Sequence, residues 1–280
     1  RRCARAPGRP RTGWGEPGNP QVLMCVPGLT RASGDLDDLA RAMAPFFRVV
    51  CPDVSGRGRS DWLRDPMLYQ VPVYVSDMVT LIARLNAQTL RYFGTSMGGL
   101  IAQHMVGDHP DRVAHLILAA TAPGGDSGVD SEPGDQAKLL GKGARTPEDA
   151  YRIACTVLYS EQFQRAHPEF IEAQIRERAQ HPVRPRVFSA QFAAMWQPDN
   201  SFQRLAAVTV PALVLHGTED VVTPFENARI LARQIPGAEL RPFEGCGHLF
   251  FHERPAETAR VVTEHLRASA SDVTQLSSEG

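Results

Sequence analysis

Short apolar runs recur along the chain and alternate with longer segments in which apolar residues repeat at helical spacing. Each run has about the length of a β-strand, and several are apolar at every position, as buried parallel strands are. This pattern predicts six strands, at Val22–Val26, Phe47–Cys51, Thr89–Phe93, Val113–Ala120, Ala212–His216 and Glu239–Phe243.

Helical patterns separate these runs, and the last of them begins at a proline that suits a first helical turn. Strands and helices that take turns along a chain are typical of an α/β fold. We therefore predict a mostly parallel sheet with helices on both faces and right-handed crossovers. The predicted helices are Asp35–Ala44, Val73–Leu85, Met97–Val106, Glu226–Gln234 and Pro255–Leu266.

The alternation stops between about residues 126 and 200. This segment opens with a stretch rich in Gly, Ser, Asp and Pro, and it contains no convincing strand. Helical patterns follow at Glu148–Tyr159, Pro168–Ala179 and Ser189–Trp196. We interpret 126–200 as a helical cap inserted into an α/β core that comprises residues 21–125 and 201–268.

Both ends of the chain have a different composition from the core. The first eleven residues carry five arginines and no acid, and no apolar run follows that would indicate a signal peptide or a membrane span. We predict that residues 1–20 are poorly ordered and that the polar tail 269–280 is disordered. The missing initiator methionine suggests a processed, fragmentary or mis-started N-terminus.

Charge and cysteine content narrow the range of partners. The chain has 30 Lys and Arg against 31 Asp and Glu, which argues against a nucleic-acid-binding surface. Its five cysteines are odd in number and include no C-x-x-C pair, which argues against a disulfide framework or a zinc site. We expect no cofactor, no metal, no membrane partner, and a reducing cytoplasmic setting; the composition leaves the oligomeric state open.

One serine lies where a predicted strand meets a predicted helix. Gly94-Thr-Ser96-Met-Gly98 has the form G-x-S-x-G between the two elements, which is typical of a nucleophile elbow. The sharp turn exposes the serine oxygen above the sheet, and the helix N-terminus adds free N–H groups suited to a developing oxyanion. An N-cap serine in a plain turn is the alternative interpretation.

A nucleophilic serine needs a base and an orienting acid, which follow the elbow in the order acid and then histidine. Asp220 lies in the turn after the predicted strand 212–216, and His248 lies in a glycine-flanked loop after the last predicted strand. Because ligands bind at the carboxyl ends of the strands in such sheets, Ser96, Asp220 and His248 should share one rim. His115 and His216 are interpreted as core residues.

Five motifs in this order resemble the α/β-hydrolase superfamily, in its capped single-domain branch of serine esterases. They are Pro27-Gly-Leu29, the segment 53–60 (DVSGRGRS), the elbow, the turn 216–220 (HGTED) and the loop 245–248 (GCGH). The resemblance covers roughly Gln21 to Leu266. It implies the predicted fold and an oxyanion hole made of the backbone N–H groups of Leu29 and Met97. Pro27 stands where the family usually has a histidine. The resemblance also makes Asp126, in the loop after Val113–Ala120, the second choice for the acid, because some members of the superfamily take it from there.

The chemistry that this triad implies is acyl transfer to water, with Ser96 as nucleophile, His248 as base and Asp220 as orienting acid. We therefore predict a carboxylic ester hydrolase acting on small esters, with Trp196, Phe192 and Leu158 of the cap as substrate-pocket candidates. Lactone, carbon–carbon bond or peracid chemistry on the same triad is the alternative. A second alternative is a non-catalytic, ligand-binding member of the fold.

Overall fold

The computed structural model describes residues 13–180, 183–197 and 199–276. Within these residues, seven strands form one sheet in the order β1-β3-β2-β4-β5-β6-β7, and every neighbouring pair is parallel except β1 with β3. The predicted α/β fold is confirmed. The strands are β1 (Gly13–Trp14), β2 (Val22–Val26), β3 (Arg48–Val50), β4 (Leu90–Thr95), β5 (Val113–Ala119), β6 (Ala212–Gly217) and β7 (Glu239–Phe243).

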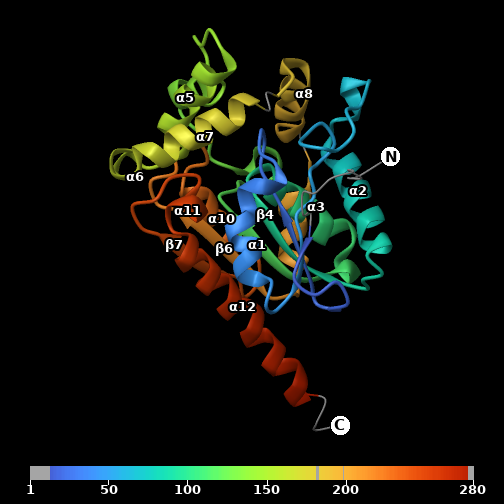
Figure 1. Ribbon diagram of the computed structural model, residues 1–280. Coiled ribbons are helices and arrows are strands. Elements are labelled where there is room, and N and C mark those ends of the chain that lie inside the picture. Colours follow the sequence, from blue (N-terminus) through green and yellow to red (C-terminus); the bar gives the residue numbers. More distant parts are fainter. Residues whose placement is uncertain (1–12, 181–182, 198, 277–280) are drawn as a thin grey trace.

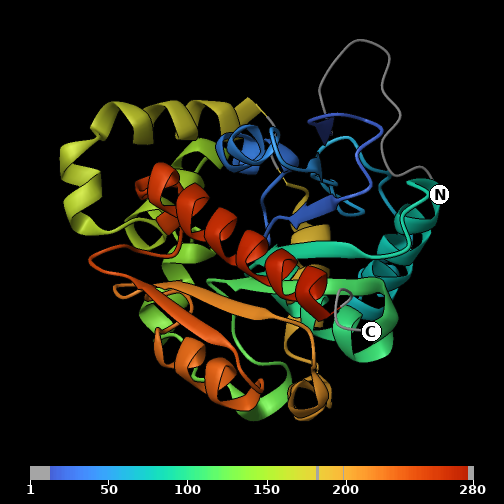
Figure 2. The same cartoon turned by 90° about the horizontal axis from the view of Figure 1, so that it is seen from below.

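Helices cover both faces of the sheet (Figures 1 and 2). One face carries α2 (Val71–Arg84), α3 (Met97–Asp108) and α10 (Glu226–Gln234). The opposite face carries α1 (Asp37–Met43) and α12 (Pro255–Leu276), which lie side by side across the strands. The elbow helix α3 is buried along nearly its whole length, because strands and other helices surround it.

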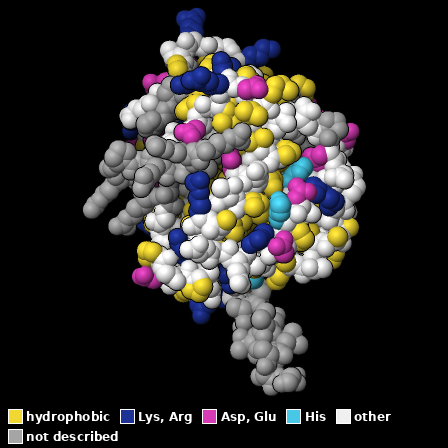
Figure 3. Space-filling model, turned by 90° about the vertical axis from the view of Figure 1, so that its right-hand side faces the viewer, with side chains coloured by type: hydrophobic (Ala, Val, Ile, Leu, Met, Phe, Trp, Pro, Cys, Tyr) yellow, Lys and Arg dark blue, Asp and Glu magenta, His cyan; other side chains and the backbone are white. Residues whose placement is uncertain are grey.

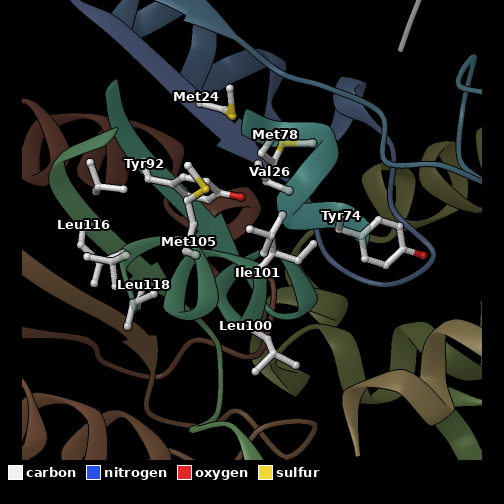
Figure 4. Packing of buried hydrophobic residues seen from close by; sticks show 14 of the residues in the cluster. Met24, Val26, Tyr74, Met78, Tyr92, Leu100, Ile101, Met105, Leu116 and Leu118 are labelled. Atoms are coloured by element: carbon white, nitrogen blue, oxygen red, sulfur yellow. The ribbon is translucent and has the colours of Figure 1, made fainter. Parts of the chain in front are cut away.

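Alternate residues of each central strand supply two separate cores, as the period of a strand requires. On β2, Met24 and Val26 face the core that α2 and α3 close, while Leu23 and Cys25 face the core closed by α1 and α12. Figure 4 shows the first core, in which side chains of β2, β4 and β5 pack against those of α2 and α3. This packing holds α3, and with it the elbow, at a fixed height above the sheet.

The described residues of the cap segment 126–200 form five α-helices: α4 (Pro133–Leu139), α5 (Pro147–Leu158), α6 (Glu161–Ala166), α7 (Pro168–Gln180) and α8 (Pro185–Met195). Four of them are labelled above the sheet in Figure 1. Leu158 and Tyr159 at the end of α5, with Ile175 of α7, belong to the same buried cluster as the strand residues Leu213 and Leu215. The cap therefore shares one hydrophobic core with the sheet.

The two ends differ from what the sequence predicted. Gly13–Trp14 forms an edge strand paired with Val49 and Val50, inside a segment predicted to be poorly ordered. A two-residue strand carries no periodic pattern, and its pairing depends on a distant segment. At the other end, α12 runs to Leu276, into the predicted disordered tail, because extending an existing helix requires no new nucleation. Residues 1–12 and 277–280 of these predictions lie outside the described residues.

Three smaller features of the fold concern a charged residue inside a strand, the cysteines and the surface charge. Arg91, the charged residue inside β4, places its guanidinium 5.2 Å from the ring centroid of Phe47, and burial lowers its pKa. Four described cysteines, Cys25, Cys51, Cys155 and Cys246, are buried free thiols. On the face seen in Figure 3, side chains of both charge signs are interspersed with hydrophobic ones, in keeping with the nearly balanced charge.

Candidate active site

Ser96 lies in the sharp turn between β4 and α3. Its backbone has φ 51° and ψ −118°, in a region that residues other than glycine rarely adopt. The Ser96 N–H donates to Ala119 O at 2.9 Å, and Thr121 Oγ1 donates to Ser96 O at 2.8 Å. Bonds from both sides of the residue thus hold the turn, and strain of this kind clusters at functional sites.

Glycines allow three segments to converge around this serine. A Cβ on Gly94 would lie 2.3 Å from Gly98 O, and one on Gly98 would lie 2.1 Å from Val26 O. A Cβ on Gly28 would lie 2.9 Å from Ser96 Cβ. No larger residue fits at these positions without displacing backbone or the nucleophile itself.

Asp220 lies in the turn that follows β6, and its carboxylate is buried. Its Oδ1 accepts hydrogen bonds from the N–H groups of Val222 at 2.9 Å and Thr223 at 2.8 Å. Burial alone would raise the pKa of this carboxyl. The charge of His248 and hydrogen bonds from His216 and His248 outweigh burial, so its pKa stays below the ordinary value and the group is ionised.

The loop that carries His248 follows β7 and is anchored to the cap as well as to the core. Gly247 N–H donates to Glu253 Oε1 at 3.0 Å, and the same carboxylate accepts from the N–H and hydroxyl of Ser160 at the end of α5. Leu249 N–H donates to Leu158 O at 2.9 Å. The position of His248 therefore depends on how the cap is seated.

The structure brings the predicted acid and base into contact. His248 Nδ1 lies 2.8 Å from Asp220 Oδ2, and both side chains are almost fully buried. Ser96 lines the same cavity as His248, although no hydrogen bond joins the two among the described residues. Such bonds are often long in a free enzyme and shorten only when substrate binds. Asp126, the second choice for the acid, lies on an exposed part of the cavity rim.

The two residues of the oxyanion-hole prediction lie on either side of the elbow turn, one in α3 and one in the loop after β2. Met97 is the first residue of α3, where a helix N–H has no acceptor within the helix. Leu29 follows Gly28 and lines the cavity beside Ser96. Pro27, which replaces the family's usual histidine, leaves the glycine after it in close approach to the nucleophile.

The cavity above Ser96 has a volume of about 280 Å³ and lies between the sheet and the cap. Its wall includes the three predicted pocket residues Leu158, Phe192 and Trp196, although Trp196 is also half exposed to solvent. The loop after β5 and the loop after β6 add residues that the sequence did not suggest, among them Pro123, Val129, Val222 and Thr223.

Segment 53–60, one of the five motifs that resemble the family, is largely buried. Arg57 is buried at 2% exposure, donates to Gly56 O, and has its pKa lowered by burial to about 10. Asp53 accepts from Ser33 N–H at 2.7 Å and from Arg59 N–H at 3.1 Å. The segment thus braces the loop that carries Leu29 and is a packed structural element.

His216 is the site residue that the sequence interpretation missed. It is buried, as predicted for a core residue, but its Nε2 lies 3.0 Å from Asp220 Oδ2. Its position four residues before the acid was the available signal. A period of two along a strand does not reveal which way the last side chain turns.

Two kinds of feature are absent from the described ranges, a metal-ligand cluster and a membrane-spanning helix. No group of three or more His, Cys, Asp or Glu side chains there could hold a metal ion. In the same part of the chain, none of the helices combines the length and apolar character needed to cross a bilayer.

Comparison with known proteins places this geometry in a family. Residues 21–255 match the model of the alpha/beta hydrolase fold. The chain is 56% identical over 110 residues to a 3-hydroxybutyrate-oligomer hydrolase of Cupriavidus necator, a match that spans 39% of this chain and only 38% of that relative. It is 31% identical over 232 residues to a poly(3-hydroxyalkanoate) depolymerase of Ectopseudomonas oleovorans, covering 81% of this chain and 77% of the relative.

A solved structure gives the same result at the level of the fold. A thermophilic esterase from Thermogutta terrifontis superposes with a TM-score of 0.76 at 25% identity, covering 92% of this chain and 91% of the other. A strained serine turn, a buried acid–histidine pair and a capped parallel sheet thus accompany a family match over most of the chain, and the protein belongs to the alpha/beta hydrolase family of hydrolases.

Proposed function

We propose that this protein is a serine hydrolase of carboxylic esters, and that its substrates are short esters of 3-hydroxy acids. The observation that carries the proposal is the 2.8 Å contact between His248 Nδ1 and Asp220 Oδ2, in a cavity that Ser96 also lines. A hydrogen-bonded imidazole beside a strained serine has the geometry that nucleophilic catalysis needs.

The reaction proceeds in two halves. Ser96 Oγ attacks the acyl carbon while His248 Nε2 takes its proton, and the N–H groups of Leu29 and Met97 stabilise the oxyanion. His248 then passes the proton to the leaving alcohol as its bond to the acyl carbon breaks, and the acyl group remains on Ser96 as an ester. Water attacks that ester with the same base and acid, so the products are an alcohol and a carboxylic acid. Asp220 holds the ring and stabilises its cation in both halves.

The cavity and the relatives support the substrate class. At about 280 Å³, the cavity lies at the small end of ligand pockets, which suits a few acyl units. The cap contributes the apolar side chains of Leu158, Phe188, Phe192 and Met195 to its wall, beside the polar Ser131 and Gln136. The two curated relatives are named for hydrolysis of 3-hydroxybutyrate oligomers and of poly(3-hydroxyalkanoate).

The test compares wild type with Ser96→Ala on p-nitrophenyl acetate, p-nitrophenyl butyrate, and dimers and trimers of 3-hydroxybutyrate. We expect Ser96→Ala to lose at least about 10³-fold in kcat, because the nucleophile is absent. Ser131→Ala is the matched control, since Ser131 is a buried serine on the same cavity wall. Turnover by wild type that Ser96→Ala retains would refute the assignment.

Two further measurements separate the alternatives. A phosphonate probe should label wild type and Ser131→Ala but not Ser96→Ala, and an unlabelled wild type would favour a non-catalytic member of the fold. A lactone series beside the oligomers tests the ester preference, and faster lactone turnover would overturn it.

Activity should fall on acidification, because a protonated His248 cannot act as base; a flat profile from pH 5 to 8 would contradict that role.

A further inference from the structure

A second histidine contacts the carboxylate that orients the first. His216 is the second-last residue of β6, four residues before Asp220, and its side chain is fully buried. Its Nε2 lies 2.7 Å from Thr223 O and 3.0 Å from Asp220 Oδ2. The reaction proposed above gives this residue no task.

The two contacts determine which ring nitrogen carries hydrogen. Thr223 O is a carbonyl oxygen and can only accept, so the nitrogen 2.7 Å away must be the donor. His216 is therefore in its Nε2–H form: this N–H donates to Thr223 O, and the same nitrogen lies 3.0 Å from Asp220 Oδ2. Its Nδ1 is buried without a partner, so a second proton on the ring would find no acceptor.

This donor completes the surroundings of the carboxylate. Asp220 Oδ1 accepts from the N–H groups of Val222 and Thr223, and Oδ2 faces both His248 Nδ1 and His216 Nε2. Four donors match the roughly four lone-pair sites of a carboxylate. Because two imidazoles approach one oxygen, the carboxylate plane is fixed and the charge on Oδ2 is divided between them.

We propose that His216 is a positioning residue of the triad, whose neutral Nε2–H holds Asp220 in the orientation that aligns His248. The proposal rests on the proposed function for its effect on turnover, but the contact itself can be tested without it. The His216 ring packs edge-on against Phe225 at 6.0 Å between centroids, so it has little freedom to turn away.

No other titratable group described below can replace His216 as the group that orients Asp220. Glu219, beside Asp220, is exposed, and Glu253 is engaged with Gly247 N–H and Ser160. Cys246, two residues before His248, has its pKa raised by burial to about 11 and is neutral in the working range. Without the His216 N–H, the negative charge on Asp220 Oδ2 interacts with His248 alone. The protonated form of His248 is then stabilised more strongly.

The experiment compares His216→Phe, which keeps a ring but no donor, with His216→Gln, whose amide reaches about as far as Nε2. We expect kcat/KM of His216→Phe to fall about 10- to 100-fold, because a small misplacement of the base is costly. Its acid limb should move up by roughly half a pH unit, since hydrogen bonds to a charged group are strong. His216→Gln should regain most of the activity and the wild-type acid limb.

His115→Phe is the matched control, because His115 is also a buried strand histidine, but on β5, with both ring nitrogens unpartnered. It should keep wild-type kcat and acid limb, with rates normalised by phosphonate titration of active sites. A folded His216→Phe variant with wild-type kcat/KM and acid limb would overturn the proposal. So would a His216→Gln variant as impaired as His216→Phe, because packing alone would then explain the loss.

An NMR titration separates this proposal from the proposed function. The imidazole signals of His248, assigned by their loss in His248→Gln, report its titration midpoint whether or not the protein hydrolyses an ester. A higher midpoint in His216→Phe than in wild type supports the proposal even if no ester is turned over. An unchanged midpoint overturns it even if Ser96-dependent esterase activity is found.

Discussion

At the scale of single residues, the site depends on contacts that allow little variation. Gly28 approaches Ser96 so closely that an added Cβ would lie 2.9 Å from Ser96 Cβ and 3.4 Å from Oγ. Asp220 has all of its oxygen contacts filled by donors from its own turn and from two histidines. Gly28 therefore tolerates no extra volume, and Asp220 does not tolerate the loss of its charge.

Gly28→Ala should reduce kcat/KM by about 100-fold, because the methyl group displaces either the nucleophile or the oxyanion segment. Steady-state kinetics on p-nitrophenyl butyrate, with circular dichroism to verify the fold, measure the effect. Gly34→Ala is the control, since a Cβ there meets no atom within 4 Å. Equal activity of the two variants would contradict the close approach.

Asp220 should also make stability depend on pH. Its pKa is held below the ordinary value, so its contribution is present above the unfolded-state value near 4 and is lost as pH falls through the lower folded value. Asp220→Asn should be less stable than wild type at pH 7 by about 1–3 kcal/mol, and the difference should shrink below about pH 4. Urea unfolding from pH 2 to 7 measures it. The exposed neighbour variant Glu219→Gln should follow wild type, and a gap for Asp220→Asn that widens on acidification would contradict the assignment.

At the scale of elements, buried charges join the cap to the core beside the oxyanion segment. Asp35 in the short helix Ser33–Leu36 pairs with Arg31 at 2.7 Å and with Arg178 of α7. Arg31 also contacts the hydroxyl of Tyr151 on α5, and it lines the catalytic cavity. Burial and the nearby Arg31 lower the pKa of Arg178. One carboxylate thus serves two buried guanidinium groups at the junction.

Asp35→Asn should destabilise the protein by about 3 kcal/mol or more, because it leaves both guanidinium groups buried without their counter-charge. Thermal and urea unfolding measure this loss. Asp38→Asn is the control, since the Asp38–Arg41 pair is exposed and such pairs contribute little. Similar losses in the two variants would show that the junction is not held by these charges.

At the scale of the whole molecule, cap and sheet form one folding unit. Residues of α5 and α7 lie in the same buried cluster as strands β2, β5 and β6 and helix α12. The His248 loop is bonded to the end of α5 through Glu253 and Leu158. The cap therefore has no separate core of its own on this side.

Unfolding should consequently be a single cooperative transition. Far-UV circular dichroism, tryptophan fluorescence and residual esterase activity should give coincident midpoints in urea. Trp196 lies at the end of α8 in the cap and Trp14 in the edge strand, so the fluorescence samples both parts. Loss of activity at a clearly lower urea concentration than loss of secondary structure would show that the cap unfolds first.

The fold and most of the site follow from local patterns in the sequence. The run 22–26 appears as a strand with the predicted bounds, because a buried strand shows itself in consecutive apolar residues. Ser96, Asp220 and His248 could be named from the elements they follow, since parallel strands end at one rim. The edge strand 13–14 and the length of α12 could not be predicted, because both depend on weak local signals and on neighbours distant in sequence.

Only the tertiary structure decided which side chains meet. Whether Asp220 or Asp126 contacts His248 depends on loop geometry, and the structure gives the 2.8 Å contact to Asp220. The burial of Arg57 and the contact between His216 and Asp220 arise from side-chain directions at the ends of elements. Periodicity identifies the face of a strand or helix, whereas hydrogen bonds between loops depend on distances that the sequence does not contain.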